Sequence, residues 1–194
     1  MDANFWKNAY RSTWGIAAER EKVVAQLIKD ATGVELRTNG LGTGSNEFIS
    51  GSASANGFVK GDADFCIPEF DIYIEVTGPL SDRVPRDSAL WIRPDKIANA
   101  IANINKGHKT FIVHHCPSAK LFRCIAIDED FVRMYANKHE FRMVYPFIRG
   151  NTEQYVEISA HHRCVRQIDH LINYIRTCVQ GESKELDSMV KRKT

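Results

Sequence analysis

The chain has 194 residues, of which 43% are hydrophobic and 26% are charged. These fractions are close to globular averages and argue against disorder, and a chain of this length buries roughly 70% of its unfolded surface, enough for a core of its own. The net charge of +2 gives no general attraction for nucleic acid, so any basic surface has to come from local clustering.

Hydrophobic periodicity and turn signals divide the first two thirds of the chain into helices and strands. A first helix is indicated by one apolar stripe with Gly33 just beyond its end. A second helix begins at Pro94, because proline is favoured at the first helical position. The predicted order is a helix at about 12–31, a strand at 34–38, a Gly/Ser/Asn-rich loop at 39–57, strands at 58–67 and 70–77, a loop at 80–93, a helix at 94–106, and strands at 110–115 and 121–127.

The last third of the chain carries weaker patterns, apart from one amphipathic helix at 164–179 with a charged tail after it that we expect to fray. A further helix is predicted at 128–138, and strands at 141–148 and 155–158. Together these elements predict an α/β fold with a mixed central sheet flanked by helices. We expect a single domain over residues 1–194, with a core at about 12–128 and a C-terminal extension at about 129–194.

The cysteines and the N-terminal residues bear on the compartment. Five cysteines without a CxxC pair, and a first segment (MDANFWKNAY) without an apolar stretch, favour a reduced, cytoplasmic protein. No apolar run approaches the roughly 18–20 residues of a membrane span, so no membrane partner is expected. The run His161-His162-Arg163-Cys164 lacks the spacing of structural zinc sites, and the sequence gives a Cys–His nucleophile no geometric support.

Acids on two consecutive predicted strands are the strongest candidates for chemistry. Asp62 and Asp64 are two residues apart and share a face, and Glu75 lies on the next strand. Neighbouring strands can bring such carboxylates close enough to share one cation, and hard oxygen ligands suit Mg²⁺ or Mn²⁺. A half-exposed strand with Glu75 on its solvent-facing side explains the same pattern. The acids alone therefore leave open both a metal site and an ordinary exposed strand.

Four segments occur in an order that resembles a known family: WGIAAEREKVVAQLI, VELRTNGLGTGS, GDADF and IYIEVTG. The family is the PD-(D/E)xK nuclease superfamily, and the likeness is greatest to archaeal Holliday-junction resolvases. The resemblance implies a restriction-endonuclease-like core and a Mg²⁺- or Mn²⁺-dependent endonuclease acting on DNA, with branched DNA as a candidate substrate. It also implies a homodimer, because resolvases cut two strands symmetrically.

Carried over residue by residue, the resemblance makes Asp64 and Glu75 the metal ligands, with Glu19 supporting them from the first helix. Ser45 matches a loop serine near the bound phosphate. Asp62 stays open as the alternative to Asp64. An ordinary exposed helix acid in a weak ion pair also accounts for Glu19, so its role depends on the resemblance.

The chain departs from the family pattern at Thr77, where the pattern has a lysine that orients water and offsets phosphate charge. We predict that Lys96 replaces it, because a cation in the first turn of a helix is disfavoured by the helix dipole unless an anion faces it. Lys60, Arg86 and Arg93 compete for this role, and the two arginines are also candidates for contacts with DNA phosphates. A DNA-binding module without catalysis and a non-enzymatic assembly protein are the rival hypotheses.

Overall fold

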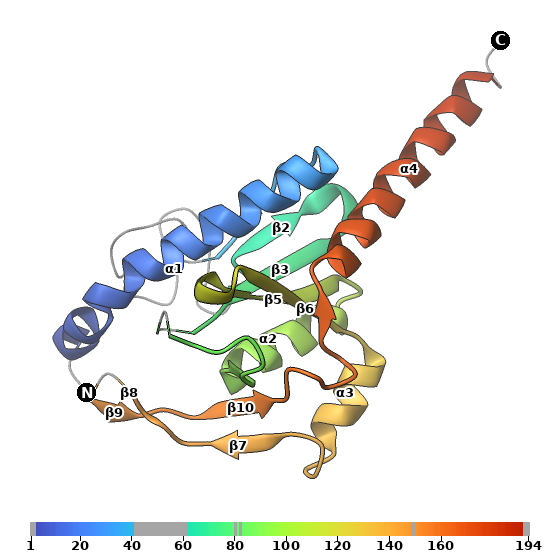
Figure 1. The fold of residues 1–194 in the computed structure, drawn as a ribbon. Coiled ribbons are helices and arrows are strands. Elements are labelled where there is room, and N and C mark those ends of the chain that lie inside the picture. Colours follow the sequence, from blue (N-terminus) through green and yellow to red (C-terminus); the bar gives the residue numbers. More distant parts are fainter. Residues whose placement is uncertain (1–2, 41–61, 80, 82, 149, 192–194) are drawn as a thin grey trace.

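The computed structural model describes residues 3–40, 62–79, 81, 83–148 and 150–191, with side chains between residues 15 and 182 of these ranges. Its main feature is a six-stranded mixed sheet with helices on both faces (Figure 1). In chain order the elements are α1 (Ala3–Thr32), β1 (Arg37–Thr38), β2 (Phe65–Ile67), the 3-10 turn η1 (Pro68–Phe70), β3 (Ile72–Thr77), β4 (Leu90–Ile92), α2 (Pro94–Ile104), β5 (Lys109–Cys116), the 3-10 turn η2 (Pro117–Ala119), β6 (Leu121–Ile127), α3 (Glu129–Ala136), β7 (Arg142–Val144), β8 (Phe147–Ile148), β9 (Asn151–Thr152), β10 (Tyr155–Ile158), β11 (Arg166–Gln167) and α4 (Asp169–Lys191).

Local signals set the ends of three helices. Gly33 adopts a φ of 74° and its N–H donates to the Lys29 carbonyl over 2.8 Å, which ends α1 in a left-handed turn. Pro94 occupies the first helical position of α2. The Asp128 carboxylate caps α3 by accepting the Phe131 N–H over 2.8 Å.

The large sheet has the strand order β1-β2-β3-β5-β6-β11. Its strands pair antiparallel, except for β3 and β5, which run parallel. The connection between these two strands includes α2, as parallel neighbours require a crossover. Both strands are largely buried, as expected for central strands covered on two faces.

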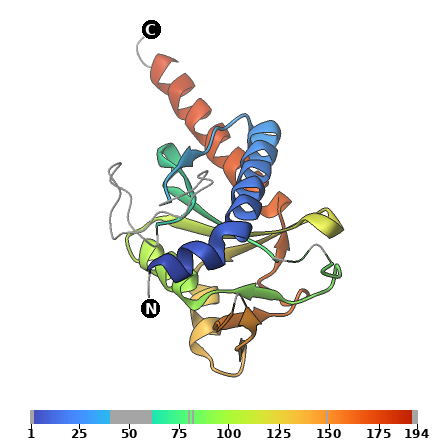
Figure 2. The same ribbon diagram turned by 90° about the vertical axis from the view of Figure 1, so that its left-hand side faces the viewer.

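Two apolar clusters lie on opposite faces of this sheet. Figure 2 shows α1 and α4 on one side and α2 and α3 on the other. Under α1 and α4, Ile74 and Val113 pack with Leu171. On the α2 side, Ile112 packs with Ile97 and with residues of α3, β4 and β10. Alternate residues of β5 therefore serve different clusters, whereas β3 contributes to the cluster under α1 and α4.

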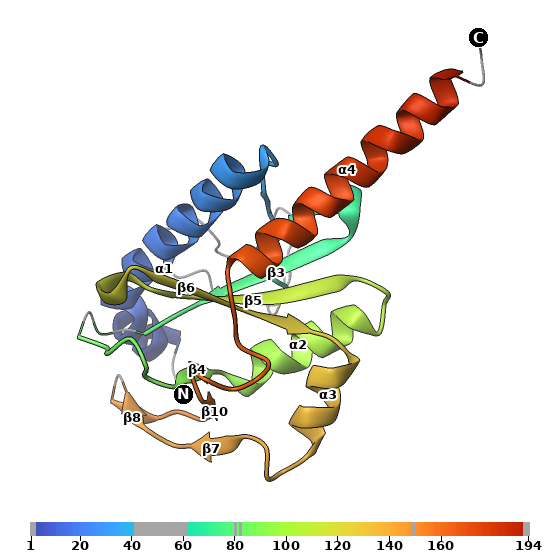
Figure 3. The same cartoon turned by 45° about the vertical axis from the view of Figure 1, so that its right-hand side comes forward.

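A second, antiparallel sheet has the order β4-β10-β7. The inner face of this sheet contributes Leu90, Ile92 and Val156 to the cluster on the α2 side. A small hairpin joins β8 to β9. Figure 3 shows this sheet across α2 from the large sheet, and it shows α4 running out beyond the body of the molecule. No helix of the described residues has the length and apolarity needed to cross a membrane.

The predicted fold class is confirmed: a mixed central sheet is flanked by helices. The elements of the large sheet keep the predicted order of helix, three strands, helix and two strands, and the structure adds β4 of the second sheet before α2. Several predicted elements differ from the structure. The predicted loop at 80–93 contains β4, because Leu90 and Ile92 are fully buried. Residues 166–167 form β11 on the edge of β6, so α4 begins at Asp169. The tail continues α4 to Lys191, and α1 begins at Ala3. Residues 58–61 of one predicted strand lie outside the described residues.

Candidate active site

Glu75 is a buried acid in the central strand β3. Its neighbours Ile74 and Val76 pack under α1 and α4, so the alternation of the strand turns Glu75 to the α2 side of the sheet. The Glu75 side chain is only 8% exposed. A carboxylate removed from water in this way needs a partner of opposite charge.

Lys96 of α2 supplies that partner. Its Nζ contacts Glu75 Oε1 and lies 3.9 Å from Asp64 Oδ2. Lys96 is in the first turn of the helix, where the dipole disfavours a cation, and the two carboxylates offset that cost. The structure thus brings together Asp64, Glu75 and Lys96, as the sequence predicted, although their chemical roles are a separate question.

Asp64 is held by the backbone of the neighbouring strand. It precedes β2, and the pairing of Phe65 with Ile74 sets it beside Glu75. Its Oδ2 accepts the N–H of Val76 over 2.7 Å, and its carbonyl accepts the N–H of Asn39 over 2.9 Å. This bonding fixes the carboxylate next to Glu75, with 16% of the side chain exposed.

Asp62, the alternative to Asp64, lies near Tyr73. Burial raises the pKa of the Tyr73 phenol, and the charge of Asp62 adds to this shift after those of Cys66 and Asp71. The ion pairs of Lys96 are with Glu75 and Asp64.

Other predicted site residues lie apart from this cluster. Glu19 is exposed on α1, which packs on the opposite face of the sheet from Glu75. Across the described side chains there is no group of three or more His, Cys, Asp or Glu placed to hold a metal ion, so Glu19 does not join the two carboxylates. Arg86 is exposed in the loop before β4, and Arg93 pairs with Asp95 at 2.8 Å. Ser45 lies outside the described residues.

A polar row beside the cluster escaped the sequence analysis. Thr77, His114 and Arg123 are cross-strand partners on β3, β5 and β6, one step along the same face from Glu75. Burial, helped by the charges of Arg123 and Arg20, lowers the pKa of His114 to about 3, so its imidazole is neutral. The only sequence signal was the alternation of TFIVHH, which places His114 on the face of Ile112.

Arg123 connects this row to the loop before β4. It is 5% exposed, and it donates to the Ser88 carbonyl over 3.0 Å and to the Arg86 carbonyl. These bonds hold the loop that carries Arg86 against the large sheet. Arg86 is therefore positioned by a buried guanidinium group that periodicity could not reveal.

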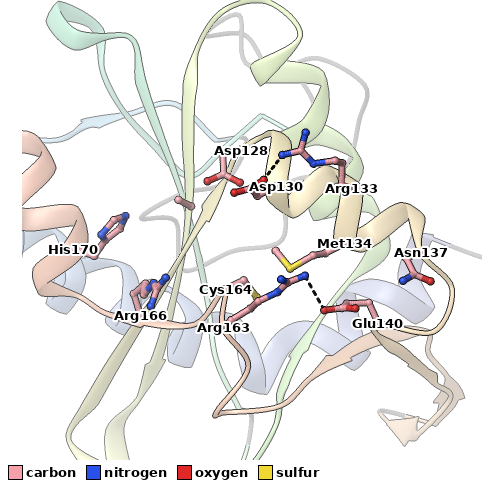
Figure 4. Close-up of a pocket in the computed structure, with 11 residues that line it drawn as sticks. Asp128, Asp130, Arg133, Met134, Asn137, Glu140, Arg163, Cys164, Arg166 and His170 are labelled. Atoms are coloured by element: carbon pink, nitrogen blue, oxygen red, sulfur yellow. Dashed lines mark hydrogen bonds and ion pairs between the residues drawn. The ribbon is translucent and has the colours of Figure 1, made fainter.

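A cavity of about 500 Å³ lies elsewhere, between α3, the end of β6 and the start of α4 (Figure 4). Three carboxylates and three guanidinium groups line it, and two pairs are in contact, Arg133 with Asp130 and Arg163 with Glu140. The formal charges of these acids and arginines balance, so the cavity lining has no net charge that would favour an anion or a cation. None of the residues around Glu75 lines it.

The edge of this cavity also holds a cysteine and a histidine in contact. Cys164 Sγ lies 3.0 Å from His162 Nδ1, and His162 Nε2 lies 3.0 Å from Glu140 Oε1. Burial raises the pKa of the Cys164 thiol to about 11, so the thiol stays protonated at neutral pH. The backbone N–H of Cys164 also donates to His162 Nδ1 over 3.2 Å. We therefore assign this contact to the structure of the loop rather than to nucleophilic catalysis.

Comparison with known proteins leaves the family open. No protein-family model matches the chain, and no curated protein matches it. Among solved structures, the chain is similar to D212, a nuclease from a fusselovirus, with a TM-score of 0.36 and 14% identity. The likeness covers 59% of this chain and 62% of the viral chain, less than two thirds of the latter. A likeness this remote assigns no activity, so function has to be argued from the site itself.

Proposed function

We propose that the protein is a metal-dependent endonuclease that hydrolyses DNA phosphodiester bonds through Asp64, Glu75 and Lys96. One observation carries the proposal: a lysine from a helix N-terminus meets two carboxylates, one on β3 and one immediately before β2. This is the combination that the resemblance to PD-(D/E)xK nucleases requires, with the lysine on the helix instead of at Thr77. The substrate class, the family and the metal are all part of the proposal.

In this proposal, Asp64 and Glu75 hold a small divalent cation. Mg²⁺ is commonly held in proteins by one or two carboxylates and completed by water and substrate phosphate. The Lys96 ammonium group shows that positive charge is accommodated between Asp64 and Glu75. When bound there, Mg²⁺ or Mn²⁺ would supply an activated water and stabilise phosphodiester charge.

The chain's own residues have distinct tasks in this proposal. Asp64, fixed by the Val76 N–H, keeps the ligand geometry, and Glu75 supplies a second oxygen donor from a rigid strand. Lys96 would orient the attacking water or a phosphate oxygen as a point charge. The contacts of Ser45, Arg86 and Arg93 with the DNA backbone belong to the same proposal, as do the homodimer and the cytoplasmic location.

A DNA-binding module without catalysis is the second candidate, and the contact of Lys96 with Glu75 favours it. This ion pair already satisfies the buried carboxylate, and Thr77 carries no charge that could replace the lysine once it is engaged. Such a protein would bind DNA with the salt dependence of phosphate contacts, and it would not cut.

A cleavage assay separates these possibilities. Linear, flap and four-way DNA are incubated with Mg²⁺, with Mn²⁺ and with chelator, using the wild type and the variants Glu75→Gln and Lys96→Met. We expect metal-dependent cleavage that each variant lowers on the order of 100-fold or more, while DNA affinity is kept. The exposed residues Glu69 and Lys138 provide matched controls, Glu69→Gln and Lys138→Met. Wild-type cleavage by Glu75→Gln would reject the site, and salt-dependent binding without cleavage would favour the binding module.

A further inference from the structure

A loop with two exposed arginines joins the two elements that form the candidate site. Residues 83–88, which we call the arginine loop, follow β3, the strand of Glu75, and precede β4 and α2, the helix of Lys96. Arg83 and Arg86 are both exposed. The loop therefore presents two guanidinium groups to solvent next to the elements that hold Glu75 and Lys96.

The described carboxylates near this loop do not neutralise its arginines. Across the described residues neither arginine forms an ion pair, and Asp87 Oδ1 lies 3.7 Å from His161 Nε2 instead. Asp82, just before the loop, lies outside the described residues. Residues 82–87 hold two aspartates and two arginines, so their net charge alone gives no reason for an anion to bind. The reason comes from how the backbone of the loop is held.

Three carbonyl groups fix the arginine loop to the end of the large sheet. Arg123 of β6 is only 5% exposed, and it donates to the Ser88 carbonyl over 3.0 Å and to the Arg86 carbonyl. The Ser118 hydroxyl, from the turn between β5 and β6, donates to the Val84 carbonyl over 3.2 Å. The carbonyl groups of three alternate residues are thus turned toward the sheet, and the backbone that carries the exposed arginines is held in one place.

The buried guanidinium group adds a positive charge to this region. The hydrogen-bond partners of Arg123 are neutral carbonyls, and among the described residues it forms no ion pair. Burial lowers the pKa of Arg123, and the charge of Arg86 also lowers it, whereas Cys116 and Asp87 raise it. Arg86 is therefore held close enough to Arg123 for their like charges to repel each other. An anion bound at the exposed Arg86 would offset that repulsion.

We infer that Arg123 is a positioning residue, which fixes the arginine loop so that Arg86 binds a backbone phosphate of DNA beside the cut. The inference rests on the proposed function, and it adds a residue that does not itself touch the DNA. Phosphate is the fitting anion because a guanidinium group can bind two of its oxygens at once. Such a contact carries no sequence information, so we expect it on linear, flap and four-way DNA alike.

The register of the sheet supports DNA as the occupant. Arg123 pairs with His114, and His114 pairs with Thr77, two residues beyond Glu75 on the same strand. The anchor of the loop therefore lies two strand spacings, about 10 Å, from β3. That distance corresponds to about three nucleotides along a DNA strand. A strand cut at Glu75 would thus have a phosphate within reach of the arginine loop.

A double-mutant cycle of DNA affinity tests the positioning role. Anisotropy of a dye-labelled duplex, measured in chelator so that no cutting occurs, compares the wild type with Arg86→Gln, Arg123→Met and the double variant. We expect each single change to lower the affinity about 10-fold and to reduce the salt slope of binding by about one. The double variant should bind no more weakly than Arg86→Gln, because Arg123 acts through Arg86. An additive loss of about 100-fold, or wild-type affinity in Arg123→Met, would overturn the inference.

Two milder variants keep the test valid if Arg123→Met unfolds. Arg123→Lys keeps the charge but lacks the fork that spans two carbonyls, so its affinity should fall between those of the wild type and Arg86→Gln. Ser118→Ala changes an exposed side chain and should lower affinity about 2- to 5-fold, but not when Arg86 is already glutamine. Wild-type affinity in both variants would reject the positioning role. Lys29→Gln, an exposed residue of α1, is the control and should bind DNA normally.

Steady-state cleavage gives a readout that a loss of folded protein would not produce. Arg123→Met should raise KM about 10-fold and leave kcat near the wild-type value, because a phosphate away from the reacting atoms is bound equally in the ground and transition states. A fall in kcat with unchanged KM would instead place Arg123 in the chemical step and overturn the inference.

The outcomes also separate this inference from the proposed function. Wild-type cleavage together with unchanged affinity in Arg86→Gln and Arg123→Met would reject the inference and leave the nuclease standing. DNA binding that depends on Arg86 and Arg123, without any cleavage, would support the positioning role and reject the nuclease. A wild type that does not bind DNA would reject both.

Discussion

Lys96 stabilises the fold as well as facing the candidate site, because its ammonium group neutralises a buried carboxylate. In Lys96→Met, the Glu75 carboxyl group remains at 8% exposure and loses its partner. We expect the free energy of unfolding to fall by about 2–3 kcal/mol. The double variant Glu75→Gln/Lys96→Met should recover most of this lost stability. Urea denaturation of the wild type, the two single variants and the double variant measures the effect as a double-mutant cycle. A double variant no more stable than Lys96→Met would show that the pair is not the cause.

Mn²⁺ and Lys96 compete for the same carboxylate if the proposed metal site is right. Lys96→Met should therefore bind Mn²⁺ more tightly than the wild type does. Saturating Mn²⁺ should raise its stability by about 3 kcal/mol at 100 times the dissociation constant. Thermal melts with Mn²⁺ and with chelator measure this effect. Glu75→Gln should show no such gain, and a gain of equal size in that variant would place the metal elsewhere.

His114 makes stability depend on pH. Its pKa is about 3 in the folded protein and about 6.5 in the unfolded chain, so below pH 6.5 the unfolded chain binds the extra proton. The contribution of neutral His114 to the free energy of unfolding is therefore complete above pH 6.5. Below that pH, the free energy of unfolding falls by up to about 1.4 kcal/mol per pH unit toward pH 3. Urea denaturation between pH 4 and 8 should show a shallower slope for His114→Asn. His139→Gln, an exposed histidine, should leave the slope unchanged.

The position of some residues of the site could be predicted from the sequence, and the position of others could not. Lys96 was predictable because its unfavourable place in a helix N-terminus required an anion. The contact of His114 with Arg123 was not, because it depends on the register of β5 and β6, which no single strand encodes. The support expected from Glu19 rested on the resemblance alone, and the residue proved exposed on the other face of the sheet.

At the scale of elements, Gly78 allows the end of β3 to approach β5 and α1 closely. A Cβ at this position would lie 2.2 Å from the His115 carbonyl oxygen and 2.7 Å from Arg20 Nε. Arg20 is buried and donates to the Pro79 carbonyl over 2.6 Å, so it cannot move away cheaply. The space between the backbone of Gly78 and the backbone of β5 therefore has no room for a side chain.

Gly78→Ala should lower the free energy of unfolding by about 2 kcal/mol or more, because backbone must shift to relieve the contact. Gly15→Ala is the matched control: nothing lies within 4 Å of its Cβ position inside α1. That change should raise stability by about 0.5–1 kcal/mol through helix propensity. Chemical denaturation of both variants measures the difference, and equal effects would contradict the role given to Gly78.

Elements with their own periodicity were predictable, and elements made by tertiary pairing were not. β10 and β3 carry clear apolar alternation, and both were located to within two residues. β4 has only three residues, and it is a strand because Ile92 pairs with Val156 more than sixty residues later. β11 forms on the edge of β6 through Arg166 and Gln167, which have no strand propensity of note.

At the scale of the whole molecule, the C-terminal extension completes both faces of the core. Leu171 and Ile175 of α4 are fully buried in the cluster that includes α1, β3 and β5. Arg176 ties α4 to the end of α1 by two hydrogen bonds to the Ala31 carbonyl, of 2.8 and 3.1 Å. On the other face, Val156 fills the cluster beneath α2. The extension and the core therefore share their interior.

We accordingly expect one cooperative unit. Calorimetry of the full chain should show a single transition, and a chain cut after Asp128 should not fold, because both apolar clusters would lose buried members. Leu171→Ala should lower the free energy of unfolding by about 2–5 kcal/mol. A cut after Gln180 is the control, since Val179 is the last described side chain that packs against either apolar cluster, and its melting temperature should stay near that of the full chain. A folded fragment 1–128 with its own sharp transition would instead define the extension as a separate domain, and the site of Asp64, Glu75 and Lys96 would then be independent of it.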